Sequence, residues 1–252
     1  MVHRPRKSPG LLLRNQWKNL RYHGWRWLPY QSADILGQLL ARMSRKGAAA
    51  AGPAGPGADY TRAALEKLPN VNVVCPGDIH SQVSVECIQS FAPSLGLSLA
   101  APILKEAVFT IPVQGTLNLH RGKLPNYRGM PPAFWELCNG ESEVGCSVHD
   151  VVASLDAGRL VAQAIVPVKQ YSTLKGLQLE LDITGIRLMT DGVQRVFTGT
   201  ASYQAQEAGG KLYRKPTLKQ QARLAVRLRC ARSLKQRSFQ GLKDAYFFLA
   251  VH

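Results

Sequence analysis

The stretch from residue 115 to residue 158 limits the possible folds of this chain more than any other part of the sequence. It begins with an apolar run that carries Asn118 and His120, two polar residues separated by one position. Residues two apart on an extended chain point to the same face, so a strand here would present both side chains together. A loop rich in glycine and proline follows, then a β-rich run over 144–152, and the stretch closes around Asp156.

Asn118, His120 and Asp156 offer the groups that an acyl-transfer reaction needs. A carboxamide can donate a hydrogen bond to a developing oxyanion, and a histidine can accept or donate a proton near neutral pH. A carboxylate can orient the imidazole and raise its pKa. No serine or cysteine of this stretch stands in a nucleophile elbow. The pattern therefore indicates direct attack by a substrate amine, without a covalent enzyme intermediate.

Each of these residues also has a structural interpretation. Asn118 could be the amide of a turn or a strand end, and His120 could be a buried histidine whose hydrogen bonds are satisfied by the core. Asp156 could cap a helix or form an Asx turn before Gly158. His149 lies in an apolar run, and we interpret it as structural.

Three short motifs occur in order around the polar residues. They are Asn118-Leu119-His120, Leu124-Pro125-Asn126-Tyr127-Arg128-Gly129 and Asp156-Ala157-Gly158. Asp156 follows Asn118 by 38 positions. The first motif alone occurs too often to indicate a particular protein family. All three motifs in this order and at this spacing are strong evidence for one. The stretch resembles the catalytic core of the folate-dependent formyltransferases, a family that includes methionyl-tRNA formyltransferase, glycinamide ribonucleotide formyltransferase and the sugar N-formyltransferases.

The resemblance implies an α/β protein with a Rossmann-like, mostly parallel sheet of the formyltransferase type. Such a domain is expected to open with a strand, a glycine-containing loop, a helix and a second strand, but no apolar β-run precedes Leu11. We therefore expect the first βαβ unit to be missing or replaced. Further along, β-branched residues predict a buried parallel strand over 71–75. Leucines at helical spacing predict a helix over 172–189 that continues through 193–196 and stops at Gly199.

The same resemblance implies a reaction. The formyl donor would be 10-formyltetrahydrofolate, and no metal would take part. A neutral primary amine would attack the formyl carbon while Asn118 and a protonated His120 donate to the oxyanion. Asp156 would hold His120 in position, keep it charged and help to move the proton from the amine.

Two further groups of residues complete the predicted site. The first follows a predicted strand over 95–100, and ligands of doubly wound folds bind outside the carboxyl ends of such strands. We expect this segment to bind the cofactor, although it could merely turn the chain. The second is a substrate loop at the mouth of the cleft, in which the arginine contacts either the substrate or an acidic neighbour. The cofactor-binding residues are Ala101, Pro102 and Ile103, and those of the substrate loop are Tyr127, Arg128 and Gly129.

Composition bounds the class of protein. At 252 residues the chain can form one sizeable α/β core with additions, and 45% hydrophobic residues indicate a globular protein. No apolar run approaches the roughly 18 residues that a transmembrane helix needs. Five cysteines without a Cys-x-x-Cys pair indicate reduced thiols, so we expect a cytoplasmic location.

The net charge of +16 is concentrated at the two ends of the chain. Residues 1–46 contain ten Lys and Arg against one acid, and residues 211–252 contain eleven against one. Basic ends indicate an anionic partner, such as a nucleic acid, a nucleotide sugar or a membrane surface. The alternative is a solvated surface in a basic proteome. We expect three domains: basic aromatic helices and a Gly/Ala/Pro linker over 1–57, a catalytic domain over 58–204 and a basic extension over 205–252.

The sequence leaves the identity of the amine open. The segment after residue 205 looks helical and basic, unlike the β-barrel that methionyl-tRNA formyltransferases carry. We therefore favour a small-molecule amine, such as an amino sugar. Methionyl-tRNA is the second candidate. A truncated, non-catalytic relative that binds an anionic partner is the third, and the pattern predicts no oligomeric state.

Overall fold

The computed structural model describes residues 21, 62–74, 77–168, 173–207 and 209–230. The chain divides into two units, residues 1–84 and 85–252. Except for Arg21, the helices and linker predicted over 1–57 lie outside the described residues, so the three-domain division stays a prediction.

The described part of the first unit contains the short helix α3 (Arg62–Leu65) and the start of α4 (Gln82–Phe91). The strand predicted over 71–75 is wrong for its described residues. Val71 and Val74 are each 39% exposed, and no strand pairs with this segment in the described ranges. A β-branched run forms a buried strand only where a neighbouring strand satisfies its backbone groups.

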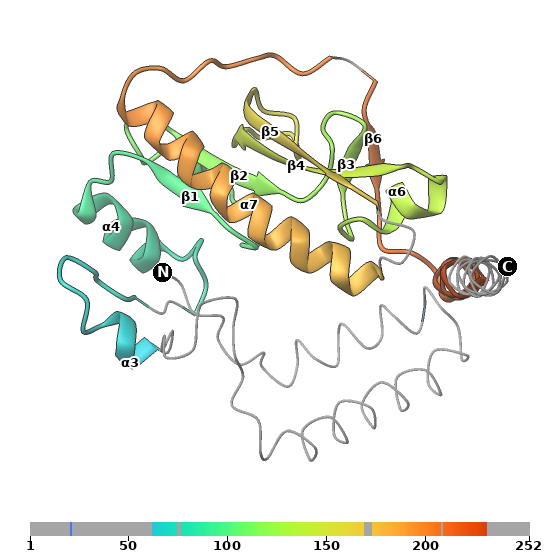
Figure 1. Ribbon diagram of the computed structural model, residues 1–252. Helices are drawn as coiled ribbons and strands as arrows, with labels where there is room; N and C mark the ends of the chain where they lie inside the picture. The colour runs from blue at the N-terminus through green and yellow to red at the C-terminus, as the bar shows by residue number, and fades with distance from the viewer. Residues whose placement is uncertain (1–20, 22–61, 75–76, 169–172, 208, 231–252) are drawn as a thin grey trace, which may run out of the picture. The chain divides into compact units, whose positions relative to one another are not determined.

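The second unit is built on a four-stranded sheet. Its strands are β1 (Gly96–Ser98), β2 (Thr116–His120), β4 (Glu143–Asp150) and β5 (Leu160–Pro167), in the spatial order β1-β2-β4-β5. β1 and β2 run parallel, whereas β2 with β4 and β4 with β5 run antiparallel. The predicted α/β class is confirmed, and Figure 1 shows the long helix α7 lying across one face of this sheet.

Helix α7 (Leu174–Phe197) confirms the helix predicted over 172–189 and its predicted continuation through 193–196. Thr173 caps its first turn by accepting a hydrogen bond from the backbone N–H of Gly176. Leu177 and Leu181 of α7 are fully buried in the core between helix and sheet. The helix therefore fixes the sheet that carries the polar residues of the central motif.

A second, two-stranded sheet joins the central stretch to the C-terminal part of the chain. β3 (Tyr127–Gly129) pairs in parallel with β6 (Lys211–Tyr213). Residues 218–230 are helical, and Leu224 packs into the same core cluster as the helix α6 (Phe134–Asn139). The described part of the C-terminal extension is thus integrated into the second unit.

Helix α5 (Glu106–Phe109) lies between β1 and β2 in the sequence and buries Val108 and Phe109. Together with the end of β1, it brackets the irregular segment 99–105. In the part of the chain that the structure describes, no helix is long and apolar enough to cross a membrane.

Candidate active site

A cavity of about 290 Å³ lies within the second unit. Four stretches far apart in the sequence line it: the segment after β1, the end of β2, the residues after β3 and the loop between β4 and β5. Seven of the nine predicted site residues line this cavity: Ala101, Pro102, Ile103, Asn118, His120, Gly129 and Asp156. Tyr127 and Arg128 do not; they border a much narrower gap beside it.

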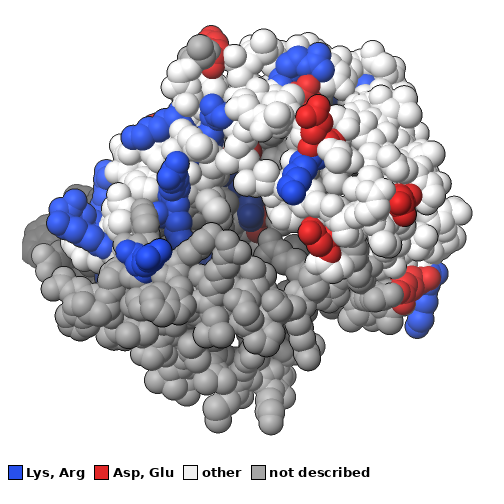
Figure 2. Space-filling view, turned by 180° about the vertical axis from the view of Figure 1, so that it is seen from behind, with Lys and Arg blue, Asp and Glu red and all other residues white. Residues whose placement is uncertain are grey.

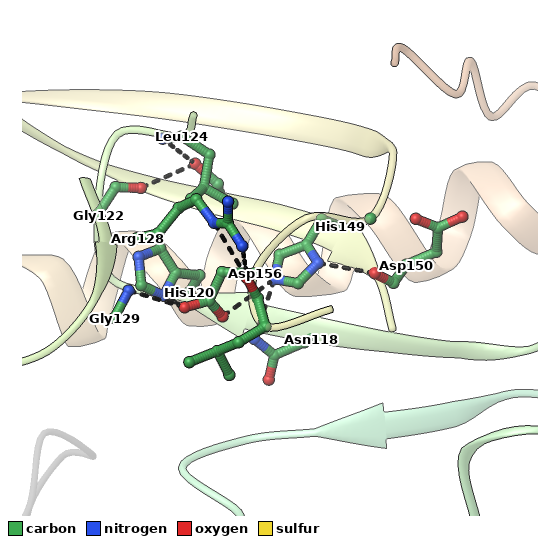
Figure 3. A network of polar contacts seen from close by, with 12 residues as sticks. Asn118, His120, Gly122, Leu124, Arg128, Gly129, His149, Asp150 and Asp156 are labelled. Carbon is green, nitrogen blue, oxygen red and sulfur yellow. Dashed lines mark hydrogen bonds and ion pairs between the residues drawn. The ribbon is translucent and has the colours of Figure 1, made fainter. Parts of the chain in front are cut away.

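Asn118 and His120 reach the cavity from the same strand, as the alternation of β2 predicts. The Nδ2 atom of Asn118 lies 3.1 Å from Nε2 of His149, and Nδ1 of His149 lies 2.7 Å from the carbonyl oxygen of Asp150 (Figure 3). A carbonyl oxygen only accepts and an amide nitrogen only donates, so Nδ1–H of His149 donates to Asp150 and Nε2 accepts from Asn118. One N–H of the Asn118 amide is thereby fixed, and its second N–H is left to donate to a ligand.

His120 is 7% exposed, and the protein contacts both of its ring nitrogens. Nε2 lies 2.7 Å from the carbonyl oxygen of Tyr127 and must donate to it. Nδ1 lies 3.5 Å from Oδ2 of Asp156. Burial lowers the pKa of His120, and the carboxylate of Asp156 offsets only part of that effect. The structure thus favours a neutral ring near pH 7, in contrast to the protonated His120 of the sequence-based mechanism, because burial disfavours the charged form.

Asp156 stands in the loop between β4 and β5 and is 8% exposed. Its Oδ2 accepts a hydrogen bond of 2.8 Å from the backbone N–H of Gly129, and its Oδ1 lies 3.7 Å from Nε2 of His149. Burial raises the pKa of Asp156, but the contact with His149, the charge interaction with His120 and the hydrogen bond from Gly129 together hold it below its usual value. Asp156 is therefore a carboxylate, held against both histidines (Figure 3).

The substrate loop contributes to this arrangement mainly through its backbone. Arg128 donates from Nε to the carbonyl oxygen of Leu155, 3.0 Å away, so its side chain holds the loop that carries Asp156. Tyr127 stacks on Tyr213 with ring centroids 5.3 Å apart. These contacts favour the structural interpretation of both side chains over direct contact with a substrate.

Sequence reasoning missed two residues that shape the cavity. His149 was interpreted as structural, yet it pairs with Asn118 across β2 and β4 and lines the cavity. Gln206, far along the chain, donates to two backbone carbonyls of the Asp156 loop. No local signal marks either residue, since both depend on contacts between distant segments.

A protein metal site usually needs three or four ligand side chains around one point. Within the described ranges, no group of three or more His, Cys, Asp or Glu side chains could hold a metal ion.

Comparison with known proteins finds one family model and several relatives that are similar to this stretch. Residues 84–190 match the family model described as Formyl transferase. The methionyl-tRNA formyltransferase of Bacteroides thetaiotaomicron is 29% identical over 144 residues, which are 57% of this chain and 44% of that protein. That of Parabacteroides distasonis is 28% identical over 135 residues, 54% of this chain and 42% of that protein. The chain thus spans less than half the length of these curated relatives.

A solved structure shows a similar fold. It is the formyltransferase PseJ from Anoxybacillus kamchatkensis, crystallised with UDP-4,6-dideoxy-4-formamido-L-AltNAc and tetrahydrofolate. The two structures share a TM-score of 0.50 at 21% sequence identity, over 60% of this chain and 77% of PseJ. The Rossmann-like character expected of the fold is confirmed.

Proposed function

Because residues 84–190 match the formyl transferase family model, we propose that this protein moves a formyl group from 10-formyltetrahydrofolate to a primary amine. The observation that carries the proposal is the convergence of Asn118, His120 and Asp156 on one cavity, with Asp156 held as a carboxylate. These are the groups that the direct attack of an amine on a formyl carbon requires.

The geometry supports a specific division of labour. The nitrogen of the amine attacks the formyl carbon and forms the new C–N bond, and the carbonyl oxygen becomes an oxyanion. The free N–H of the Asn118 amide donates to that oxyanion. The amine passes its proton to the pair formed by Nδ1 of His120 and Oδ2 of Asp156, which lie 3.5 Å apart. The C–N bond to the folate nitrogen then breaks, and that nitrogen takes the proton, so no net proton is consumed.

The donor would bind against the segment Ala101, Pro102 and Ile103. All three residues line the cavity, and Ile103 is 72% exposed, so its apolar side chain is available to a ligand. The cavity of about 290 Å³ is close to the smallest volumes usual for small-molecule sites. Backbone groups of this irregular segment can hydrogen-bond a pterin ring.

For the acceptor, we favour a small amine such as an amino sugar, free or linked to a nucleotide. Residues 211–229 contain seven Lys and Arg and no acid, and none of the seven forms a salt bridge with a carboxylate in the described ranges. Lys and Arg side chains also gather toward one side of the face in Figure 2. Because β6 pairs with β3 beside the cavity, this charge supports an acceptor that carries phosphate.

Methionyl-tRNA is the second candidate acceptor. The observation that favours it is the sequence similarity to two bacterial methionyl-tRNA formyltransferases. The same basic residues could contact the phosphates of an RNA. A relative that binds an anionic partner without catalysis is the third candidate, and the assembled cavity argues against it.

The test is a formyl-transfer assay with purified protein, 10-formyltetrahydrofolate and three acceptors: a free amino sugar, a nucleotide-linked amino sugar and methionyl-tRNA. We expect turnover with one of the sugars and a loss of at least roughly 100-fold in His120→Ala and Asn118→Ala. His80→Ala is the matched control, because His80 does not line the cavity. Turnover with methionyl-tRNA alone would favour the second candidate.

Calorimetric titration with a stable analogue of the donor tests donor binding separately from turnover. A folded protein that does not bind the analogue would contradict the proposed function. Binding without turnover of any of the three acceptors would leave the donor site correct and the acceptor class wrong.

A further inference from the structure

The backbone at Asp156 has an unusual conformation. Its φ of +50° lies in the left-handed region, which residues with a side chain rarely adopt. Such strain persists only where the surroundings determine the conformation. Within the loop, Ala157 donates a long hydrogen bond of 3.3 Å to the carbonyl oxygen of Ser154. The loop therefore needs support from other parts of the chain to keep the carboxylate in the cavity.

Gln206 supplies such support from about 50 residues further along the sequence. Its Nε2 lies 3.1 Å from the carbonyl oxygen of Asp156 and 2.6 Å from that of Gly158. One side-chain amide thus bridges the two carbonyls on either side of Ala157. Because these bonds act on the backbone, they fix the direction in which the Asp156 side chain leaves the loop.

The position of Gln206 is itself fixed. Two residues earlier, Gln204 forms an antiparallel bridge with Leu160, the first residue of β5, through two backbone hydrogen bonds of 2.8 Å. The loop of Asp156 ends where β5 begins. The segment that carries Gln206 and the loop that it holds are therefore anchored at the same point of the sheet.

The oxygen atom of the Gln206 amide indicates that glutamine occupies this position because of the two hydrogen bonds that its nitrogen donates. Its Oε1 atom is buried and has no hydrogen-bond partner among the described residues. A buried polar atom without a partner is unfavourable, and an apolar side chain of similar length would avoid it. The contacts that Nε2 makes with the loop offset that penalty.

We propose that Gln206 is a positioning residue for Asp156, which holds the 156–158 backbone so that the carboxylate faces His120 and the backbone N–H of Gly129. The inference rests on the proposed function for its effect on catalysis, but not for its structural part. Gln206 lines no part of the cavity, so it acts only through the loop. A misplacement of a catalytic group by about 1 Å can lower the rate by roughly 100-fold.

The test compares Gln206→Met with Gln204→Met, because the Gln204 side chain is exposed and only its backbone forms the bridge. Methionine keeps the length of glutamine but cannot donate. The first readout needs no activity: it is the NMR chemical shift of the Gly129 amide proton, which reports the 2.8 Å hydrogen bond to Asp156. The second is kcat and KM for formyl transfer.

We expect the Gly129 amide signal of Gln206→Met to move toward its position in Asp156→Asn, and kcat to fall roughly 10-fold to 100-fold with little change in KM for the donor. Gln204→Met should match the wild type in both readouts. Unchanged readouts in Gln206→Met, or equal losses in Gln204→Met, would overturn the inference. If the wild type transfers no formyl group at all, the proposed function fails, and the Gly129 signal alone decides whether Gln206 positions Asp156.

Discussion

Asn118 and His149 face each other across the antiparallel pair β2 and β4, and their side chains meet at 3.1 Å between Nδ2 and Nε2. The backbone carbonyl of Asp150 fixes the tautomer of His149, because it takes the hydrogen bond from Nδ1–H. The ring is 3% exposed, so it has little freedom to turn away. His149 therefore orients the amide that would donate to the oxyanion.

The first prediction tests that orientation through His149→Phe, which keeps a ring of similar size but cannot accept a hydrogen bond. We expect kcat to fall roughly 10-fold, less than for Asn118→Ala, because the amide is still present but free to rotate. KM for the donor should change little. Steady-state kinetics with His80→Phe as control would measure this, and a wild-type kcat in His149→Phe would show that Asn118 needs no such support.

The second prediction concerns pH. The pKa of His120 is lowered, so the ring loses its proton below the ordinary value of about 6.5. If the neutral ring accepts the proton of the amine, kcat should fall as pH drops through that lowered pKa. The acidic limb should thus have its midpoint below pH 6.5, measured with an amine that is itself neutral over the range.

Asp156→Asn gives the control for this pH dependence. The variant removes the carboxylate that raises the pKa of His120, so the NMR titration of His120 should move to still lower pH. An acidic limb centred above pH 6.5, or a titration that moves upward in Asp156→Asn, would contradict the assignment of a neutral His120.

Local patterns in the sequence were sufficient for the residues that share one element. Asn118 and His120 meet in the cavity because residues two apart in any strand share a face. The leucines over 172–189 predicted α7 because helical spacing is also a local property. The β-branched residues over 71–75 also form a local pattern, and that pattern predicted a strand. No partner strand pairs with this segment in the described ranges, so the strand does not form.

Contacts between distant segments could not be predicted in this way. His149 meets Asn118 only because β2 and β4 adopt one particular register, and a slip of one residue would turn His149 to the other face. β6 is three residues long, too short for its alternation to stand out within a basic tail. Gln206 reaches the Asp156 loop across about 50 residues, and no spacing rule covers that distance.

The third prediction concerns stability at a buried acid outside the cavity. Glu136 of α6 is 2% exposed, and its Oε1 has no hydrogen-bond partner among the described residues. Burial raises the pKa of Glu136 from 4.5 to about 7. The folded state therefore keeps a proton that the unfolded state loses, and stability falls as pH rises from about 4.5 to 7.

Glu136→Gln should remove this pH-dependent penalty. A pKa that differs by about 2.5 between the unfolded and folded states corresponds to roughly 3 kcal/mol of unfolding free energy, fully lost above pH 7 and retained below pH 4.5. We expect the unfolding free energy of the variant to rise relative to that of the wild type as the pH increases from about 5 to about 8. Urea unfolding of both proteins at these two pH values measures the change. Glu207→Gln is the control, because it removes one exposed carboxylate, and an equal gain there would assign the effect to net charge.

The fourth prediction concerns the glycine that joins the substrate loop to the carboxylate. Gly129 has a φ of +88° and donates its N–H to Asp156. A Cβ atom at this position would overlap the carbonyl oxygen of Tyr213 in β6. Gly129→Ala should therefore separate β3 from β6 and displace Asp156. We expect kcat to fall by at least roughly 10-fold, and the unfolding free energy to fall by more than backbone strain alone would cause.

Gly199→Ala isolates the contribution of the backbone conformation. Gly199 has a φ of +69°, but a Cβ atom there would meet no other atom within 4 Å, so the variant carries the backbone strain without the overlap. We expect it to lower the unfolding free energy by roughly 1 kcal/mol without loss of kcat. Urea unfolding and initial rates measure both effects. Equal behaviour of the two variants would mean that the contact between β3 and β6 does not hold Asp156 in place.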